Sequence, residues 1–319
     1  MWRASLFVLA ACTFDHGVGA GSGDDTPSCT TTPPWWDPAF VARFPLSVSA
    51  PPGYTLRVDA SQALAAGPDV RVVVHDTQAR EIDRLLESPA VTFKVPSSGS
   101  IWLYAGPGTG TAKASLPNIF LFAEDFASIP TATNADGPFI PLPANEWNVV
   151  DDAGNHVLHA AGIARHGAAI RGLMPADAEI SARIRFGAGG GQNHVGLAMH
   201  GNSMAADTFD GFVTQLQLDI SHWRIAEYIN GASPPTELTG IDRAVARGKW
   251  YALRMRIIGD TITFFVDDQL VVSTTKAGAD GNMIGLFAHN CDVDYDDVRV
   301  RMAASPEPTA TLGAVQRCE

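Results

Sequence analysis

The sequence predicts an all-β protein with two domains, a small β-sandwich followed by a larger antiparallel sandwich. Hydrophobic residues make up 46% of the 319 residues and charged residues only 18%, which is enough apolar material for a sizeable core. The 30 glycines and 21 prolines are typical of many short strands joined by turns. Short alternating or β-branched segments recur along the chain, and no helical period interrupts those of its second half.

The charge balance excludes one class of partner. The chain carries 22 lysines and arginines against 34 aspartates and glutamates, so its formal net charge is -12. Binding to a phosphate backbone requires clustered cations. We therefore expect no nucleic-acid partner.

The first residues are typical of an export signal. A single positive charge precedes an apolar run at residues 4–11, which has the length of a signal-peptide core and is too short to span a bilayer. The run ends in Leu9-Ala10-Ala11-Cys12, which resembles the lipobox of bacterial lipoproteins. This resemblance implies removal of residues 1–11, acylation of the Cys12 thiol, and a place at the outer membrane or cell surface with the lipid anchor as the membrane contact. An ordinary secretory signal with an incidental cysteine is the alternative.

Residues 12–34 are rich in glycine, serine, threonine and proline, a composition typical of a flexible tether. The remaining cysteines are Cys29, Cys291 and Cys318, and none has metal-ligand spacing. Disulfides are expected outside the cytosol, and these three thiols allow one bridge whose pairing the sequence leaves open. A free Cys12 would allow two bridges. No later segment is long and apolar enough for a transmembrane helix.

Residues 35–115 form the expected first domain, a small β domain. Its predicted strands are residues 54–58, 69–75, 91–95 and 101–104. They are rich in β-branched residues or alternate between apolar and polar residues, and turns that contain proline or glycine separate them. Within this domain only residues 77–86 are suited to a helical turn.

An ordered set of motifs runs through this domain: Trp35-Trp36-Asp37, Arg43, Gly53-Tyr54, Asp69-Val70-Arg71-Val72-Val73 and Ile101-Trp102-Leu103-Tyr104-Ala105-Gly106-Pro107. The set resembles an uncharacterised bacterial domain of unknown function that opens with a tryptophan pair and occurs in secreted and surface multidomain proteins. That family has no established activity, so the resemblance implies location and architecture only. We interpret Trp35 and Trp36 as core residues, with stacking on a sugar as the alternative.

Residues 116–303 form the expected second domain, and residues 304–319 a C-terminal tail. Turns at residues 259–260 and 267–268 mark hairpins. The predicted strands are residues 179–186, 195–199, 212–218, 224–229, 250–258, 261–266, 270–273, 284–288 and 298–300. Their antiparallel succession is typical of a β-sandwich.

Motifs from both ends of the second domain point to one fold. They are Phe122-Ala123-Glu124-Asp125-Phe126, Gly248-Lys249-Trp250-Tyr251, Ile262-Thr263-Phe264-Phe265-Val266-Asp267, Gly285-Leu286 and Asp296-Asp297-Val298-Arg299-Val300. Together they resemble the concanavalin A-like lectin/glucanase sandwich. The resemblance implies a jelly roll with one convex and one concave sheet, of which the concave one often holds saccharides.

The hydrolases of that fold carry Glu-x-Asp-x-x-Glu on one strand, which places a nucleophile and an acid/base on one face, about 5–5.5 Å apart in retaining enzymes. The glutamates of the second domain lack partners at this spacing: Glu124, Glu146, Glu179, Glu227 and Glu237. The sequence also lacks a Gly-x-Ser-x-Gly elbow. His156 and His159 are three residues apart and would face opposite sides of a strand. We therefore expect a protein without catalytic activity.

A structural calcium ion is the one cofactor that the sequence suggests. Several members of that fold bind calcium where the first and last strands meet, and the matching positions are Asp125 and Asp296. If Val298 and Val300 point inward, alternation places Asp296 inward as well, where a carboxylate needs a partner such as a hard cation. A solvated turn around Asp296 is the alternative.

Two successive strands predict a polar face suited to a glycan. His194 and His200 alternate with core positions of one strand, and Gln215 and Gln217 share a face of the next. Amides and an aromatic platform suit sugar hydroxyls and the apolar face of a sugar ring. The predicted ligand-binding residues are His194, His200, Gln215, Gln217, Trp223 and Tyr228. A solvated sheet face is the alternative.

A second outward face carries arginines. Arg254 and Arg256 share it, near Arg243, Arg247 and Lys249, and it would suit an acidic polysaccharide or lipid headgroups, or be a soluble surface only.

These observations together favour a surface-tethered, non-catalytic binding or adhesion module with a glycan as its ligand. The first alternative is a structural envelope protein that contacts other proteins. The second is a glycan-active enzyme whose site differs from that of the family.

Overall fold

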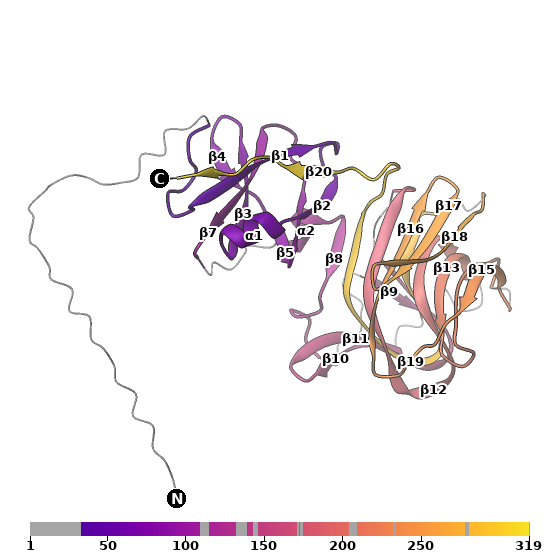
Figure 1. Cartoon of the computed structure of the whole chain (residues 1–319). Coiled ribbons are helices and arrows are strands. Elements are labelled where there is room, and N and C mark those ends of the chain that lie inside the picture. The colour runs from indigo at the N-terminus through magenta and orange to yellow at the C-terminus, as the bar shows by residue number, and fades with distance from the viewer. Residues whose placement is uncertain are drawn as a thin grey trace, which may run out of the picture.

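The computed structural model describes residues 33–108, 115–131, 139–142, 146–170, 172, 175–203, 209–231, 234–277 and 281–318. They form a nearly all-β protein, as predicted, and the smaller of its two domains lies beside one end of the larger (Figure 1). The expected signal peptide and most of the expected tether, with Cys12 and Cys29, lie outside the described residues.

The first domain packs two small sheets around one core. The strands of its larger sheet are β1 (Ala42–Val48), β3 (Asp69–His75), β4 (Ala79–Glu81), β7 (Ser100–Gly106), β20 (Ala310–Leu312) and β21 (Gln316–Arg317). Those of its smaller sheet are β2 (Thr55–Asp59), β5 (Arg84–Glu87) and β6 (Ala90–Lys94). The larger sheet has the order β20-β1-β7-β3-β4, with β21 also on β1, and the smaller one the order β2-β6-β5. Apolar residues that alternate along these strands, such as Val72, Phe93 and Leu103, meet between the sheets.

Three elements of this domain differ from the expectation. Residues 77–86, expected to hold a helical turn, contain β4 and all but the last residue of β5, whereas the short helix α1 (Ser61–Ala66) was not predicted. Residues 304–319, expected to be a tail, contain β20 and β21, which pair with β1 at the edge of the larger sheet. A local pattern cannot reveal such pairing, because Arg43 and its partner Gln316 are 273 residues apart. In Figure 1 this yellow C-terminal segment returns to the indigo first domain.

The second domain follows the short helix α2 (Leu116–Ile119) and is a large antiparallel sandwich. Its strands are β8 (Phe122–Glu124), β9 (Phe139–Leu142), β10 (Trp147–Asp152), β11 (Asn155–Ile170), β12 (Ala178–Ser203), β13 (Asp210–Gln217), β14 (His222–Tyr228), β15 (Thr236–Asp242), β16 (Trp250–Ile258), β17 (Thr261–Val266), β18 (Gln269–Thr275) and β19 (Met283–Met302).

Two long strands hold the layers of this sandwich together. The second half of β12 pairs with β13 and with the first half of β19, and with β11, β14 and β15 these segments form what we call the front sheet. The first half of β12 pairs with β16 and with the second half of β19, and with β8, β17 and β18 these form the back sheet. Side chains from both sheets share one core, in which Trp223 of the front sheet contacts Tyr251 of the back sheet at 6.2 Å between ring centroids.

A β-bulge interrupts the alternation of β19. Asp297 has a φ of 51°, and the register with β12 shifts between the pairs Ser181↔Arg299 and Arg183↔Asp296. Val298 and Val300 therefore face the core, as expected, but Asp296 faces away from it, toward Arg183.

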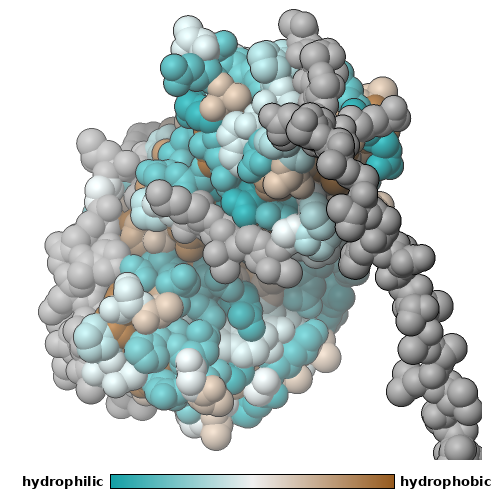
Figure 2. Space-filling view, turned by 90° about the vertical axis from the view of Figure 1, so that its left-hand side faces the viewer, coloured by the Kyte–Doolittle hydropathy of each residue, from teal (hydrophilic) through white to brown (hydrophobic). Residues whose placement is uncertain are grey.

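The domains are joined by two chain segments and by direct contacts. Arg301 of the second domain donates to the hydroxyl of Tyr54 at 3.2 Å, and Arg299 pairs with Glu87 of the first domain at 2.7 Å. On the face shown in Figure 2, hydrophilic residues cover most of both domains and hydrophobic ones are scattered.

Candidate functional site

The outer face of the front sheet carries a row of polar side chains. Residues directly opposite one another on five strands form this row: His289, His194, Gln217, His222 and Asp242. Directly paired residues of neighbouring strands point to the same side of a sheet, so these side chains lie next to one another. Their neighbours Val195 and Leu197 point the other way into the core, as predicted.

A second row adds an arginine and a glutamate to this face. Arg224 lies opposite Gln215 and Gly240, and its Nε donates to Oε1 of Gln215 at 2.7 Å. A terminal nitrogen of Arg224 donates to Glu237 at 3.4 Å. A Cβ atom at Gly240 would collide with Nε2 of His222 and lie 2.8 Å from Oε1 of Glu237. Glycine at this position therefore leaves the space that the imidazole and the carboxylate occupy. We call His194, Gln217, His222, Arg224, Glu237 and Asp242 the polar face.

His222 links the two carboxylates of the polar face. Its Nε2 lies 3.2 Å from Glu237 and its Nδ1 lies 2.8 Å from Asp242. The Glu237 side chain is 41% exposed and that of Asp242 is 93% exposed. Both carboxylates consequently retain oxygen lone pairs for a ligand, while the imidazole fixes their positions.

His194 is the more buried of the two histidines of the polar face. Burial, followed by the nearby His289 and Arg224, lowers its pKa to about 4, although Asp219 at 3.5 Å opposes this. At neutral pH its Nε2 therefore accepts a hydrogen bond from the amide nitrogen of Gln217 at 3.0 Å. The Gln217 carbonyl oxygen is buried and has no hydrogen-bond partner in the described part of the chain.

An aromatic cluster adjoins the polar face on the same side of the sheet. The rings of Phe209, Tyr228 and Phe287 lie 5.1 to 5.4 Å apart, and all three side chains are buried. The Tyr228 hydroxyl accepts a hydrogen bond from the amide of Gln215 at 3.0 Å. The cluster thus packs beside the polar face, where Tyr228 positions Gln215 and Gln215 in turn positions Arg224.

The structure brings together four of the six predicted ligand-binding residues. His194, Gln215, Gln217 and Tyr228 lie on one face, but Gln215, Gln217 and Tyr228 are buried, at 0%, 2% and 1% exposure, and support the face rather than line it. Trp223 lies on the opposite side of β14 and belongs to the core.

His200 is also absent from this face. It has a φ of 55° at an irregularity of β12, which turns it toward Phe212, and its Nε2 hydrogen-bonds the carbonyl of Ala176 at 2.8 Å. Sequence reasoning missed His222, Arg224, Glu237 and Asp242. The signal for two of them was present, because His222 and Arg224 have the same strand parity as Tyr228.

The residues predicted to hold calcium do not fit a metal ion. Asp296 is 4% exposed, accepts from Asn155 Nδ2 at 3.0 Å and from the amide of Asp297, and lies 3.5 Å from the cation of Arg183. Asp125 is exposed and caps the amide of Ala127 at 3.2 Å. No group of three or more potential metal ligands occurs among the described residues. Because the bulge at Asp297 breaks the expected alternation, a guanidinium and an amide occupy the place expected for a cation.

The described part of the chain contains two cysteines and the tryptophan pair of the first domain. Cys318 is disulfide-bonded, whereas Cys291 is a free thiol whose burial raises its pKa to about 12. In the first domain, Trp35 and Trp36 pack against Tyr104 and its buried neighbours Phe40 and Trp102. This packing agrees with our interpretation of the pair as core residues of the first domain.

Among the comparisons with known proteins, only solved structures gave matches. No family model and no curated protein matches the sequence. A solved carbohydrate-binding module, CBM66 from Bacillus subtilis, matches with a TM-score of 0.43 and 14% identity over 54% of this chain and 94% of its own. A Bacillus subtilis protein of unknown function with a galectin-like fold gives 0.43 and 8%, over 57% of this chain and 96% of its own.

A third solved structure is the exoplasmic/lumenal domain of VIP36 in a form bound to Ca2+ and Man3GlcNAc, with a TM-score of 0.42 and 11% identity over 57% of this chain and 90% of its own. Among the described residues, no helix is long and apolar enough to cross a membrane.

Proposed function

We propose that this chain is a non-catalytic carbohydrate-binding module and that the polar face of its second domain binds the glycan. The observation that carries the proposal is the arrangement of His222, Arg224 and Glu237. Each is fixed by hydrogen bonds to a neighbouring strand, and each lies on the solvent side of the sheet.

This arrangement suits sugar hydroxyls. A hydroxyl both donates and accepts, so it is bound best by a donor and an acceptor held side by side, as Arg224 and Glu237 are. Glu237 and Asp242 supply exposed acceptors on either side of His222. Because these groups are oriented before a ligand arrives, little side-chain entropy is lost on binding.

The same geometry favours binding over hydrolysis. A glycosidase needs one carboxyl group as an acid and another as a nucleophile or base. Here Glu237 and Asp242 share one imidazole, which hydrogen-bonds both of them. The sequence also lacks the Glu-x-Asp-x-x-Glu motif, so we assign these carboxylates to recognition.

The test is a glycan array and affinity electrophoresis on the full chain. We expect binding to a defined set of glycans, and a loss of about 10-fold or more in affinity for Glu237→Gln and for His222→Ala, since removal of one good polar contact costs about 1–3 kcal/mol. Asp260→Asn, an exposed carboxylate in the turn between β16 and β17, is the matched control. Unchanged binding by Glu237→Gln and His222→Ala would reject this site. Binding to envelope extracts without binding to glycans would favour the structural envelope protein instead.

The proposal includes attachment to the bacterial cell envelope through a lipid on Cys12. It is supported by the lipobox-like Leu9-Ala10-Ala11-Cys12 alone, which lies outside the described residues. The test is labelling of expressing bacteria with a palmitate analogue. We expect label and membrane association for the unchanged chain, and neither for Cys12→Ala. Membrane-free secretion of the unlabelled unchanged chain would show an ordinary secretory signal.

A further inference from the structure

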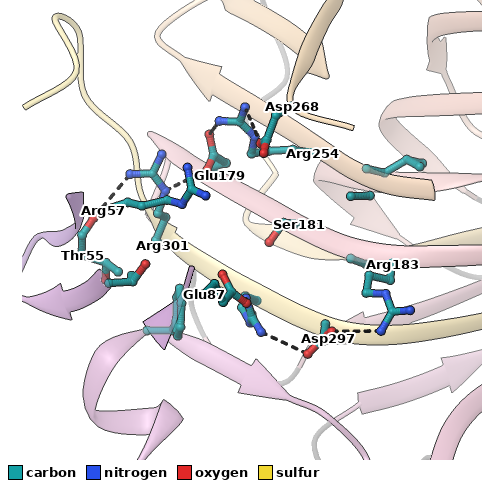
Figure 3. Close-up of a pocket in the computed structure, with 16 residues that line it drawn as sticks. Thr55, Arg57, Glu87, Glu179, Ser181, Arg183, Arg254, Asp268, Asp297 and Arg301 are labelled. Atoms are coloured by element: carbon teal, nitrogen blue, oxygen red, sulfur yellow. Dashed lines mark hydrogen bonds and ion pairs between the residues drawn. The ribbon is translucent and has the colours of Figure 1, made fainter. Parts of the chain in front are cut away.

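A cavity of about 330 Å³ lies where the two domains meet (Figure 3). The first domain contributes Thr55, Arg57 and Glu87 to its walls, and the back sheet of the second domain contributes Ser181, Arg183 and Arg299 among others. We call this cavity the junction pocket. It is separate from the polar face, which lies on the front sheet.

The junction pocket gathers cations in a protein of net charge -12. Five arginines line it: Arg57, Arg183, Arg254, Arg299 and Arg301. Its lining holds four carboxylates, so the balance is one positive charge. The predicted arginine face of the back sheet, with Arg254 and Arg256, thus borders a cavity rather than open surface.

Each of the four carboxylates is already paired. Glu179 is almost fully buried and lies 3.2 Å from Arg254 and 2.8 Å from Arg301, which keep its pKa below its usual range despite burial. Asp268 lies 3.5 Å from Arg254.

The other two carboxylates both contact Arg299, Glu87 at 2.7 Å and Asp297 at 3.0 Å, and Asp297 also lies 3.5 Å from Arg183. Arg57 is exposed and forms no ion pair with any carboxylate in the described ranges. Arg57 is therefore the lining guanidinium that has no carboxylate partner within the described residues.

Two further donors in the lining are unused. The Ser181 hydroxyl has no hydrogen-bond partner among the residues that the structure describes, and Figure 3 shows it near the middle of the ring of charged side chains. The Nε of Arg299 is buried and also lacks a partner within the described part of the chain. Phe120 adds an aromatic ring to the lining. The accessible part of the pocket thus offers one guanidinium without a carboxylate partner, the Ser181 hydroxyl, and an apolar surface.

We propose that the junction pocket binds a single acidic sugar unit of the hexuronate type. Its carboxylate pairs with Arg57, and one of its hydroxyls hydrogen-bonds Ser181. The one lining guanidinium without a carboxylate partner matches a monoanion, and the volume is at the lower end of the range for small-ligand pockets, which suits one ring rather than a chain of sugars. Because walls come from both domains, the bound sugar also links them.

The test is isothermal titration calorimetry of the full chain with sodium glucuronate and sodium galacturonate, with glucose as the neutral probe. We expect binding of at least one uronate, weaker binding at high salt, and no binding of glucose. Arg57→Gln should lower the uronate affinity about 10-fold or more, since a charge-assisted contact is worth about 1.5–3 kcal/mol. Arg80→Gln, another exposed arginine of the first domain, should leave it unchanged.

Several outcomes would overturn the inference. They are the absence of uronate binding, equal binding by Arg57→Gln, and sulfate binding as tight as uronate binding, since sulfate has the charge without the sugar. His222→Ala tests the polar face separately. It should leave uronate binding intact, so failure at one site is distinguishable from failure at the other.

Discussion

The guanidinium carbon of Arg43 lies 4.4 Å from the centre of the Trp102 ring, and the arginine side chain is 0% exposed. The same carbon lies 4.7 Å from the centre of the Trp35 ring. The guanidinium also donates hydrogen bonds to the hydroxyl of Tyr104 at 3.0 Å and to the side-chain oxygen of Gln316 at 2.8 Å. One cation therefore joins the start of the first domain, its central strand and the C-terminal segment.

The first prediction concerns this buried cation. Arg43→Lys keeps the charge but loses the planar fork that reaches Tyr104 and Gln316, and we expect it to destabilise the first domain by about 2–4 kcal/mol. Urea unfolding followed by tryptophan fluorescence measures this. Arg80→Lys, at an exposed position, should change the free energy of unfolding by less than about 0.5 kcal/mol. Equal stability of the two variants would show that the arginine contacts contribute nothing specific.

The second prediction concerns the glycine under the polar face. In Gly240→Ala the new methyl group collides with the imidazole of His222, so the ring must turn away from Glu237. We expect weaker glycan binding with the fold retained, measured by affinity electrophoresis and by circular dichroism. Thr236→Ala, an exposed position of the same strand, is the control and should bind normally. Wild-type binding by Gly240→Ala would show that the position of the imidazole is immaterial.

The third prediction concerns acid stability. The folded pKa of His194 is about 4, below its unfolded value of about 6.5, so the unfolded chain binds the proton first as the pH falls. The contribution of His194 is present above about pH 6.5 and is lost between about 6.5 and 4, at most about 3 kcal/mol. His194→Gln should flatten that part of the curve of unfolding free energy against pH.

His159 provides the opposite case in the same protein. Its hydrogen bond to Asp294 raises its pKa, so its contribution is present at low pH and is lost as the pH rises through the folded pKa. His159→Gln should therefore reduce stability on the acid side. If both variants changed the curve in the same direction, the assignment of these pKa shifts would be wrong.

The fourth prediction concerns calcium. Because Asp296 accepts from Asn155 and faces Arg183, we expect neither calcium nor a chelator to change the thermal unfolding midpoint. Differential scanning calorimetry with calcium, with chelator and with neither compares the three states. A calcium-dependent rise of several degrees that Asp296→Asn abolishes would contradict the ion pairs seen here.

Local patterns were sufficient for the architecture of the second domain and for part of its site. Alternation in β12 and β13 places Val195 and Leu197 in the core and His194 and Gln217 on the other side, as the structure confirms. The same rule, applied along β14, would have separated Trp223 from Tyr228, since they are an odd number of residues apart.

Other features depend on structure that no local pattern encodes. The bulge at Asp297 reverses the orientation of Asp296, and the irregularity at His200 removes that residue from the polar face. The burial of Gln215 follows from Phe209 and Tyr228 packing beside it, and the junction pocket exists only because the first domain lies against the back sheet. Such features follow from tertiary packing.

The pairing of β20 and β21 with β1 also bears on the order in which the protein is made. A ribosome makes β1 early, and it makes β20 and β21, which pair with one edge of β1, only after the whole second domain has been synthesised. Until then, β1 is an unprotected sheet edge, which is a template for mispairing with other chains. A chain that ends after residue 303 would thus contain every strand of the second domain, but its first domain would lack β20 and β21 and would be prone to aggregate.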